Sequence, residues 1–433
     1  MAAPIAAPAT PLFPGAVAIV RVSGDRLAEI LSPLLTLPRP RFASLRTLVW
    51  GGFRERAMVL YFPAPASYSG EDVVEFHLHG NPLLVRRFME HLEQLGIRLA
   101  QPGEFTRRAL LNGKQSLLDA EMLKDVMDAA TDAQLRQAQA RKGGIPTWIA
   151  EGKAKLAPWI ARAEAQVDYG DEESISLDVA ALKRDLEPLR ARFHVEHRQA
   201  EAAQWLRNGI RIALVGRPNA GKSTLFNALA GEDRAIVTEI PGTTRDVLEV
   251  RTEWAGFPLY LFDTAGLRNT EDPVERLGIA RVQAVLEKAD LILHLVPSMD
   301  ESPDPDILER LKPYAWKTVV VRTFADAAPL EGELQVSAAR GDLSSLQNFL
   351  KDRFLGELAP EACLGALATH RQRELLSELL IQMELLFGLE EACPPEIVAS
   401  SLQGLWALLL RLTGEDRAET SLDHVFSGFC LGK

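Results

Sequence analysis

The stretch RIALVGRPNAGKST, residues 211–224, decides the fold of the central part of this chain. Its first five residues are strand-like, and they lead into a Gly-x-x-x-x-Gly-Lys-Ser motif that begins at Gly216. A helix-forming run, TLFNALAG, follows at residues 224–231. A strand, a glycine-rich loop of this spacing and a helix together form the phosphate-binding loop of nucleotide hydrolases. We therefore predict that the chain binds a nucleoside triphosphate.

The residue types in this loop suit phosphate and cation chemistry. Glycines let backbone N–H groups approach a β-phosphate, Lys222 adds a positive charge, and the Ser223 hydroxyl is a candidate Mg²⁺ ligand. The polar loop residue Asn219 has two interpretations. It is either a ligand for a monovalent cation or a residue that stabilises the loop turn.

Later segments indicate that the nucleotide is GTP. PGTTRD supplies Thr244, or alternatively Thr243, as a second Mg²⁺ ligand, and LFDTAG ends a strand at Asp263. VVVRTFAD resembles the Asn/Thr-Lys-x-Asp signature of GTPases and places Asp326 to pair with guanine N–H donors. VSAARG is expected to end a further strand. The residues expected to contact the nucleotide are Asn219, Ala220, Gly221, Lys222, Ser223, Thr224, Thr238, Thr243, Thr244, Asp263, Thr264, Ala265, Gly266, Thr323, Asp326, Ser337 and Ala338.

Two side chains depart from the usual GTPase pattern. Phe324 occupies the lysine position of the base-reading signature, where its ring can stack on a purine but cannot bond to the phosphate loop or the ribose. Leu267 follows the DxxG glycine, where Ras-like GTPases carry a glutamine that orients water. No arginine is obviously placed as a finger, so a monovalent cation at Asn219 is a candidate replacement.

Composition limits the remaining function classes. The chain has 433 residues, of which 47% are hydrophobic and 25% charged, so we expect a globular protein of several domains. The net charge of −11 argues against extensive non-specific binding of nucleic acid. Three cysteines are too few for a disulfide framework, and neither a signal peptide nor a membrane span is recognisable, which predicts a reducing cytosol.

The segments on either side of the α/β block differ in character. Residues 1–112 alternate strand and helix signals and predict a small α+β domain, in which DVVEFHLHG places Glu75, His77 and His79 on one strand face. Long helical patterns follow in residues 113–208 and return in residues 357–433. We predict that the α/β block, residues 209–356, is inserted into one helical domain. A metal site at the three strand-face residues is the weaker interpretation of that face, because one face of one strand rarely supplies a closed ligand set.

The sequence ends in FCLGK, which places Cys430 fourth from the carboxyl end. A prenylation box would place a cysteine there, but Gly432 is not aliphatic and no polybasic run precedes it. Two interpretations remain. Cys430 either packs as a small apolar residue, or it acts as a nucleophile or acid whose pKa is lowered by a cation such as Lys433.

The order of SYSGEDVVEFHLHG, PGEFTRRALLNGK, GRPNAGKST, PGTTRD and the terminal FCLGK resembles the tRNA-modification GTPase family MnmE, also called TrmE. The resemblance covers essentially the whole chain. It implies an amino-terminal α+β folate-binding domain that dimerises, a discontinuous helical domain and an inserted Ras-like P-loop G domain. It further implies work with the FAD-dependent partner MnmG in a heterotetramer that installs an aminomethyl-type group on C5 of the wobble uridine (U34) of tRNA. The resemblance also implies that the one-carbon unit comes from 5-formyl- or 5,10-methylene-tetrahydrofolate and that K⁺ stimulates GTP hydrolysis.

The resemblance also assigns residues by their position in the shared motifs. Glu275, in DPVERLG, matches the acidic residue that helps to position the attacking water. The positions that match folate contacts are Arg21, Glu75, Lys114 and Lys433. The positions that match K⁺ ligands are Asn219, Thr238, Ile240 and Thr243, and those that match Mg²⁺ ligands are Ser223 and Thr244.

Other functions remain open from the sequence. One is a pure GTPase switch, such as a ribosome-assembly factor, which predicts no folate binding and a basic RNA-binding module. Another is a degenerate regulatory homologue, suggested by Phe324 and by two departures in the first domain: TPLFPGAVAIV, where relatives read closer to Thr-Pro-Pro-Gly-Arg-Gly, and Asn81, where a second glycine is common.

Overall fold

The computed structural model describes residues 3–141, 145–169, 177–230, 249–254, 257–263, 282–300, 302–327, 332–354, 363–416 and 432. Of residues 230, 249–251 and 263 only the backbone is described. The chain divides into two compact units: residues 1–124, 143–177 and 394–433 form the first, and residues 125–142 and 178–393 form the second.

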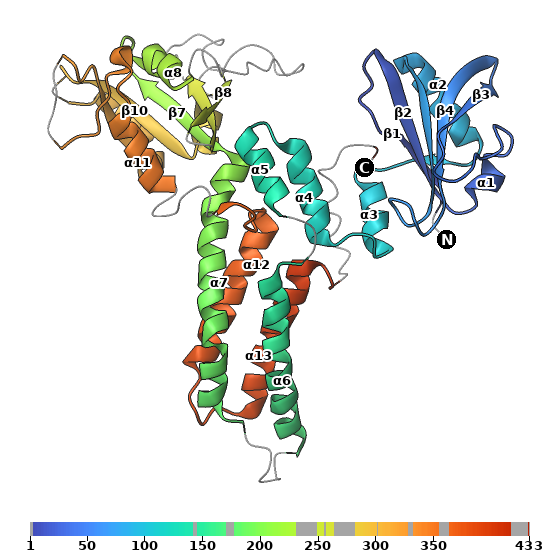
Figure 1. The fold of residues 1–433 in the computed structure, drawn as a ribbon. Helices are drawn as coiled ribbons and strands as arrows, with labels where there is room; N and C mark the ends of the chain where they lie inside the picture. The colour runs from blue at the N-terminus through green and yellow to red at the C-terminus, as the bar shows by residue number, and fades with distance from the viewer. Residues whose placement is uncertain are drawn as a thin grey trace. The chain divides into compact units, whose positions relative to one another are not determined.

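The first unit contains a six-stranded sheet in the order β3-β4-β5-β2-β1-β6 (Figure 1). The strands are β1 (Ile5–Pro8), β2 (Gly15–Gly24), β3 (Ser44–Trp50), β4 (Phe53–Phe62), β5 (Asp72–Gly80) and β6 (Arg98–Leu99). Its helices are α1 (Leu27–Ile30), α2 (Pro82–Gln94), α3 (Glu104–Leu111), α6 (Thr147–Tyr169) and α13 (Pro395–Thr413).

The expected alternation in β5 is confirmed. Val74, Phe76 and Leu78 are buried in a core with α2, and Phe76 meets Phe88 of that helix edge to face with ring centroids 5.0 Å apart. Glu75 and His77 face the other side of the sheet. Because successive side chains of a strand alternate in direction, burial of one set fixes where the other set points.

Asn81 has a local structural role. It caps α2, and its side-chain oxygen accepts hydrogen bonds from the backbone N–H groups of Leu83 and Leu84 at 2.9 and 3.1 Å. Its φ of −104° does not require glycine, so the departure from the common glycine at this position is accommodated by the helix cap.

The second unit contains a five-stranded sheet in the order β11-β10-β7-β9-β8. Strands β7, β9, β10 and β11 are parallel and β8 is antiparallel to β9. The strands are β7 (Ile210–Gly216), β8 (Glu249–Trp254), β9 (Phe257–Asp263), β10 (Leu291–Pro297) and β11 (Thr318–Thr323). The described part of this α/β block includes the helices α8 (Lys222–Ala230), α10 (Pro305–Leu311) and α11 (Ser344–Phe354), helical residues 282–288, and the 3₁₀ turns η1 (Lys312–Lys317) and η2 (Ala338–Arg340).

The expectation of a strand ending in VSAARG is wrong. Gln335 forms a single isolated bridge with Arg322, held by backbone hydrogen bonds from Arg322 N to Leu334 O and from Val336 N to Arg322 O, both 2.8 Å. The backbone turns into η2 directly afterwards. Two hydrogen bonds to one residue of β11 position this segment without extending the sheet.

In each unit, a long helix that precedes the α/β block in the sequence packs on a long helix that follows it. In the second unit α7 (Val179–Asn208) packs on α12 (His370–Gly388), and in the first α6 packs on α13 (Figure 1). Each pair joins a helix that precedes the α/β block to one that follows it, as an insertion requires, while the domain boundaries stay a prediction. The expected helical stretch after residue 117 also contains an unforeseen break, because Thr131 begins α5 (Asp132–Ala140) with a capping box to Gln134 and so separates it from α4 (Leu117–Asp128).

Candidate functional site

The phosphate-binding loop lies between β7 and α8, as predicted. The Lys222 ammonium donates hydrogen bonds to the carbonyls of Gly216 and Arg217, each at 2.7 Å. Asn219 and Gly221 have φ angles of +65° and +83°, which curl the loop over the N-terminus of α8. Gly216 has a separate constraint, because a Cβ there would lie 2.7 Å from the Leu295 carbonyl of β10. Backbone N–H groups at the start of α8 and the nearby ammonium suit a phosphate.

The segment expected to bind the base is tied to this loop. Thr323 is buried at the end of β11, and its hydroxyl donates to the Ala220 carbonyl at 2.9 Å. Phe324 follows with a φ of +59°, and its Cζ lies 3.6 Å from the position that a Cβ on Gly221 would occupy. The aromatic ring of Phe324 therefore lies against the phosphate-binding loop.

Asp326 and Ser337 are also brought together, as expected for one base-binding edge. The Ser337 hydroxyl donates to Asp326 Oδ1 at 2.9 Å, and Arg340 Nε lies 3.4 Å from Oδ2. The backbone of Ala325 bonds to Val336 and so holds the two loops side by side. A carboxylate steadied by a serine hydroxyl can accept from two parallel N–H donors, which guanine offers and adenine lacks.

This geometry predicts a change of base preference. An Asp326→Asn variant is expected to bind xanthosine nucleotides better than guanosine nucleotides, because the amide presents a donor where the carboxylate accepted. Competition binding of GDP and XDP to both proteins measures the preference. An unchanged preference for guanine would mean that Asp326 does not contact the base.

A second polar site lies on the sheet of the first unit. Arg21 in β2 stands opposite Glu75 in β5, and its Nε donates to Glu75 Oε1 at 2.9 Å. The guanidinium lies over the rings of Tyr68 and Phe105, 5.4 and 5.9 Å from their centroids. Its other end donates to the backbone carbonyl of Gly432 at 3.3 Å, so residues far apart in the chain meet at one cation.

Gly432 is required at this contact. Its φ is +95°, and a Cβ there would lie 2.2 Å from the Pro8 carbonyl of β1. The Lys114 side chain is exposed and packs at Gly70, in the loop that carries Tyr68, and it forms no ion pair within the described part of the chain.

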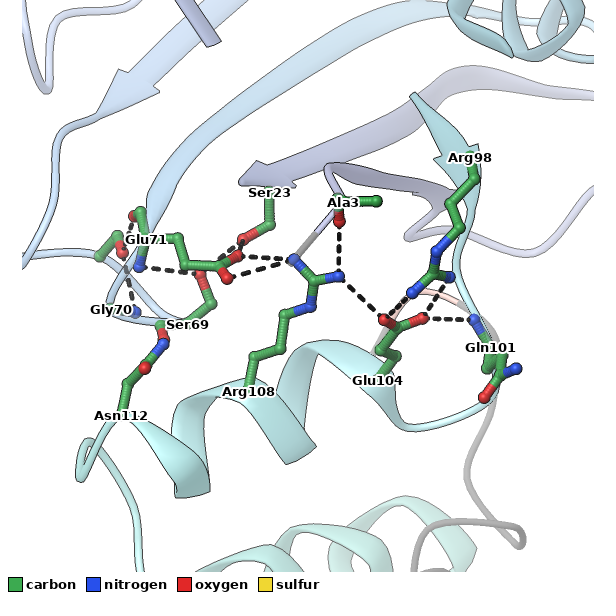
Figure 2. Close-up of polar contacts among 11 residues, drawn as sticks. Ala3, Ser23, Ser69, Gly70, Glu71, Arg98, Gln101, Glu104, Arg108 and Asn112 are labelled. Atoms are coloured by element: carbon green, nitrogen blue, oxygen red, sulfur yellow. Dashed lines mark hydrogen bonds and ion pairs between the residues drawn. The ribbon is translucent and has the colours of Figure 1, made fainter. Parts of the chain in front are cut away.

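A buried network supports the loop that carries Tyr68 (Figure 2). Arg108 of α3 donates to both oxygens of Glu71 at 3.1 and 3.0 Å, to Glu104 at 2.9 Å and to the Ala3 carbonyl at 2.7 Å. Ser23 of β2 bonds to Ser69 at 2.6 Å and to Glu71 at 2.7 Å. The sequence analysis used PGEFTRRALLNGK and SYSGED to recognise the family and did not predict the contacts of Arg108 with Glu71 and Glu104. The four-residue spacing of Glu104 and Arg108 on a helix is the local signal that could have indicated their ion pair.

Glu104 receives several charge-assisted hydrogen bonds. Burial alone would raise the pKa of Glu104, but hydrogen bonds from Arg98, the Gln101 backbone N–H and Arg108 outweigh it and lower that pKa to about 2. Because the folded-state pKa lies below the ordinary 4.5, the ionised group stabilises the fold above pH 4.5, and this stabilisation is lost as the pH falls towards 2.

The pH dependence of unfolding tests this assignment. Between pH 7 and pH 3 the chain is expected to lose roughly 2 kcal/mol more stability than a Glu104→Gln variant, because the amide does not titrate. Denaturant unfolding of both full-length proteins, followed by circular dichroism at both pH values, gives the difference. Parallel loss in both proteins would contradict the low pKa of Glu104.

Several expected site residues lie outside the described residues, and for Asp263 only the backbone is described, at the end of β9. These residues are Thr238, Ile240, Thr243, Thr244, Thr264, Ala265, Gly266, Glu275, Cys430 and Lys433. Of the helices in the described part of the chain, none is both long enough and apolar enough to cross a membrane.

The mostly parallel sheet, the loop with Lys222 and the Thr323–Asp326 edge define a P-loop GTPase. The family described as GTP-binding protein TrmE N-terminus matches residues 4–114, and that described as 50S ribosome-binding GTPase matches residues 211–323. The chain is 42% identical over 450 residues to the tRNA modification GTPase MnmE of Phenylobacterium zucineum, covering 99% of both chains. It is 38% identical over 445 residues to MnmE of Thermus thermophilus, again covering 99% of both. The chain belongs to the MnmE family of tRNA modification GTPases, and the resemblance inferred from the motifs is confirmed.

Proposed function

We propose that this chain couples GTP hydrolysis to the transfer of a one-carbon unit from a tetrahydrofolate derivative to tRNA. With an FAD-dependent partner, MnmG, it would help to install an aminomethyl-type group on C5 of the wobble uridine, in the cytoplasm. The observation that carries this proposal is the meeting of Arg21, Glu75 and the Gly432 carbonyl at one place. A pure GTPase switch has no use for such a site.

The residues around Arg21 fit a reduced folate. A carboxylate such as Glu75 accepts from the N–H groups of a pteridine ring, and cations suit the carboxylates of the folate tail. Arg21, Lys114 and Lys433 are the cations assigned to this role. The bound folate supplies the one-carbon unit. Cys430, two residues before Gly432, is assigned as the nucleophile or acid that acts on it.

In the proposed function, GTP binds at the phosphate-binding loop. Lys222 and the N-terminus of α8 would bind the phosphates, Ser223 and Thr244 would hold Mg²⁺, and Asp326 would read guanine. Glu275 would position the attacking water. The K⁺ ligands would be Asn219, Thr238, Ile240 and Thr243. The positive φ of Asn219 shows that this residue has a non-helical backbone conformation within the loop.

Potassium dependence follows from this assignment and from Leu267, which cannot orient water. GTP turnover is expected to be at least about 10-fold faster in KCl than in NaCl at equal ionic strength, because K⁺ would supply charge that an arginine finger supplies elsewhere. An Asn219→Ala variant should lose this difference. Equal rates in the two salts for the unchanged protein would rule the mechanism out.

The homodimer is supported by the open face of the six-stranded sheet. Val17, Leu45, Val49 and Met58 are large apolar residues that are 54%, 56%, 61% and 41% exposed on β2, β3 and β4. An exposed apolar sheet face of this kind marks a protein contact. Assembly with MnmG and tRNA would build on this dimer.

Calorimetric titration with 5-formyltetrahydrofolate tests the proposal. The intact chain is expected to bind, a chain lacking Lys433 to bind more weakly, and a Gly432→Ala variant to bind more weakly still, because the added methyl group displaces the segment from β1. A Gly332→Ala variant is the matched control: Gly332 also has a positive φ, of +81°, but a Cβ there meets nothing within 4 Å. No binding by the folded, intact chain would instead support a GTPase without folate chemistry.

A further inference from the structure

His77 in β5 carries a buried ring nitrogen that has no hydrogen-bond partner among the described residues. Its Nε2 is enclosed, and the carboxylate oxygen Glu75 Oε2 lies 3.6 Å away, beyond hydrogen-bond distance. The directly opposed residues on the neighbouring strands are Met58 in β4 and Ile19 in β2, and neither side chain can satisfy it. A buried polar atom left unpaired costs stability, so it requires an explanation.

His79 provides the contrast on the same strand face. Its Nδ1 lies 2.6 Å from Glu55 Oε1, and its side chain is 73% exposed. The side chain of His77 is only 19% exposed. The protein therefore pairs the exposed histidine and leaves the enclosed one unpaired beside Glu75.

Strand geometry directs His77 at the Arg21–Glu75 site. Side chains two residues apart on a strand share a face, and Glu75 and His77 are such a pair. Glu75 uses Oε1 to accept from Arg21, which leaves Oε2 facing the imidazole. An unpaired imidazole nitrogen, a carboxylate oxygen and a guanidinium thus lie together on one patch of the sheet.

A metal ion does not explain this arrangement. Among the described residues, no three His, Cys, Asp or Glu side chains are placed to hold one. His79, the third residue of the strand face, is bonded to Glu55 instead. An organic ligand with a polar ring edge remains as the group that would use the nitrogen.

We infer that His77 Nε2 makes a hydrogen bond to the ligand of the Arg21–Glu75 site, a reduced pteridine carrying a one-carbon unit. The inference rests on the proposed function and adds a binding residue to it. An imidazole nitrogen donates or accepts according to its tautomer, so it suits either an N–H or a carbonyl group of such a ring. In the ligand-bound protein the unpaired atom gains its partner, which favours binding.

Calorimetry of the full chain with 5-formyltetrahydrofolate tests the inference. A His77→Leu variant is expected to bind about 10-fold more weakly, because one hydrogen bond is lost. A His77→Gln variant should bind within about 3-fold of the unchanged chain, because its amide can occupy the position of Nε2. The matched control is His79→Gln, which should bind as the unchanged chain does.

The outcomes separate this inference from the proposed function. If the unchanged chain does not bind the folate, the proposed function fails and the inference falls with it. If the unchanged chain binds and His77→Leu binds equally well, only the inference is wrong. A second measurement does not depend on how His77→Leu folds: in protein with ¹⁵N-labelled histidine, the Nε2 resonance that disappears in His77→Gln should shift on saturation with folate. An unshifted resonance would overturn the inference.

Discussion

Replacing Lys222 by alanine is expected to lower GTP hydrolysis by at least about 100-fold. The ammonium lies over the phosphate-binding loop, held by the carbonyls of Gly216 and Arg217 at 2.7 Å, where it can meet the β- and γ-phosphates. Alanine removes the charge that stabilises the transferring phosphoryl group. It also removes the donor that bonds to the carbonyls of Gly216 and Arg217, so the loop loses two stabilising hydrogen bonds.

Steady-state hydrolysis at saturating GTP measures this effect, and binding of a fluorescent GDP analogue shows how much of it comes from affinity. Lys351→Ala is the matched control, because Lys351 is an exposed lysine on α11 of the same unit and should leave the rate unchanged. Thermal unfolding of all proteins verifies that the variants fold. A rate for Lys222→Ala within about 3-fold of the unchanged chain would contradict the assignment of this loop.

Replacing Arg108 by methionine is expected to destabilise the first unit by about 3 kcal/mol, because it removes the buried cation that Glu71 and Glu104, two largely enclosed carboxylates, share. The Arg108 side chain is only 7% exposed and pairs with both Glu71 and Glu104. Methionine retains much of the length of the stem but none of the donors. The loop with Tyr68 should then become less ordered, and Arg21 would lose the ring beneath it.

Denaturant unfolding and folate calorimetry together test this role. The control is Arg87→Met, because Arg87 is half exposed on α2, pairs with Glu90 at 2.8 Å, and should change stability by less than about 0.5 kcal/mol. A double variant, Arg108→Met with Glu71→Gln, should recover part of the loss, since one unpaired charge is removed. If Arg108→Met were as stable as the Arg87 control, the network would have no structural importance.

The strand–loop–helix at residues 210–230 was predictable because it depends on neighbours in sequence. Glycine spacing, the lysine and the apolar strand act within one turn of chain, so β7 and α8 form where the motif placed them. The burial of Phe76 and the opposite orientation of Glu75 followed in the same way from strand alternation. These elements could therefore be predicted from neighbouring residues in the sequence alone.

Other features required the folded chain. Phe324 was recognised as a departure, but its contact with Gly221 depends on β11 lying two strands from β7. The strand that VSAARG was expected to end is only an isolated bridge between Gln335 and Arg322. Its formation depends on the position of Arg322 in β11 and not on the composition of the VSAARG segment. Whether an extended segment becomes a strand is decided by its partner.

By itself, the sequence determined that this chain is a P-loop GTPase, because that signal is a spacing between near neighbours, and the order of its motifs resembled the MnmE family. Only the tertiary structure decided that Arg21 meets Gly432, 411 residues away, and that Arg108 pairs with two carboxylates. It also decided that, among the described residues, His77 Nε2 has no hydrogen-bond partner while His79 bonds to Glu55. Such contacts depend on strand register and on which loop covers which sheet face. These are collective results of burying apolar surface, and no local pattern encodes them.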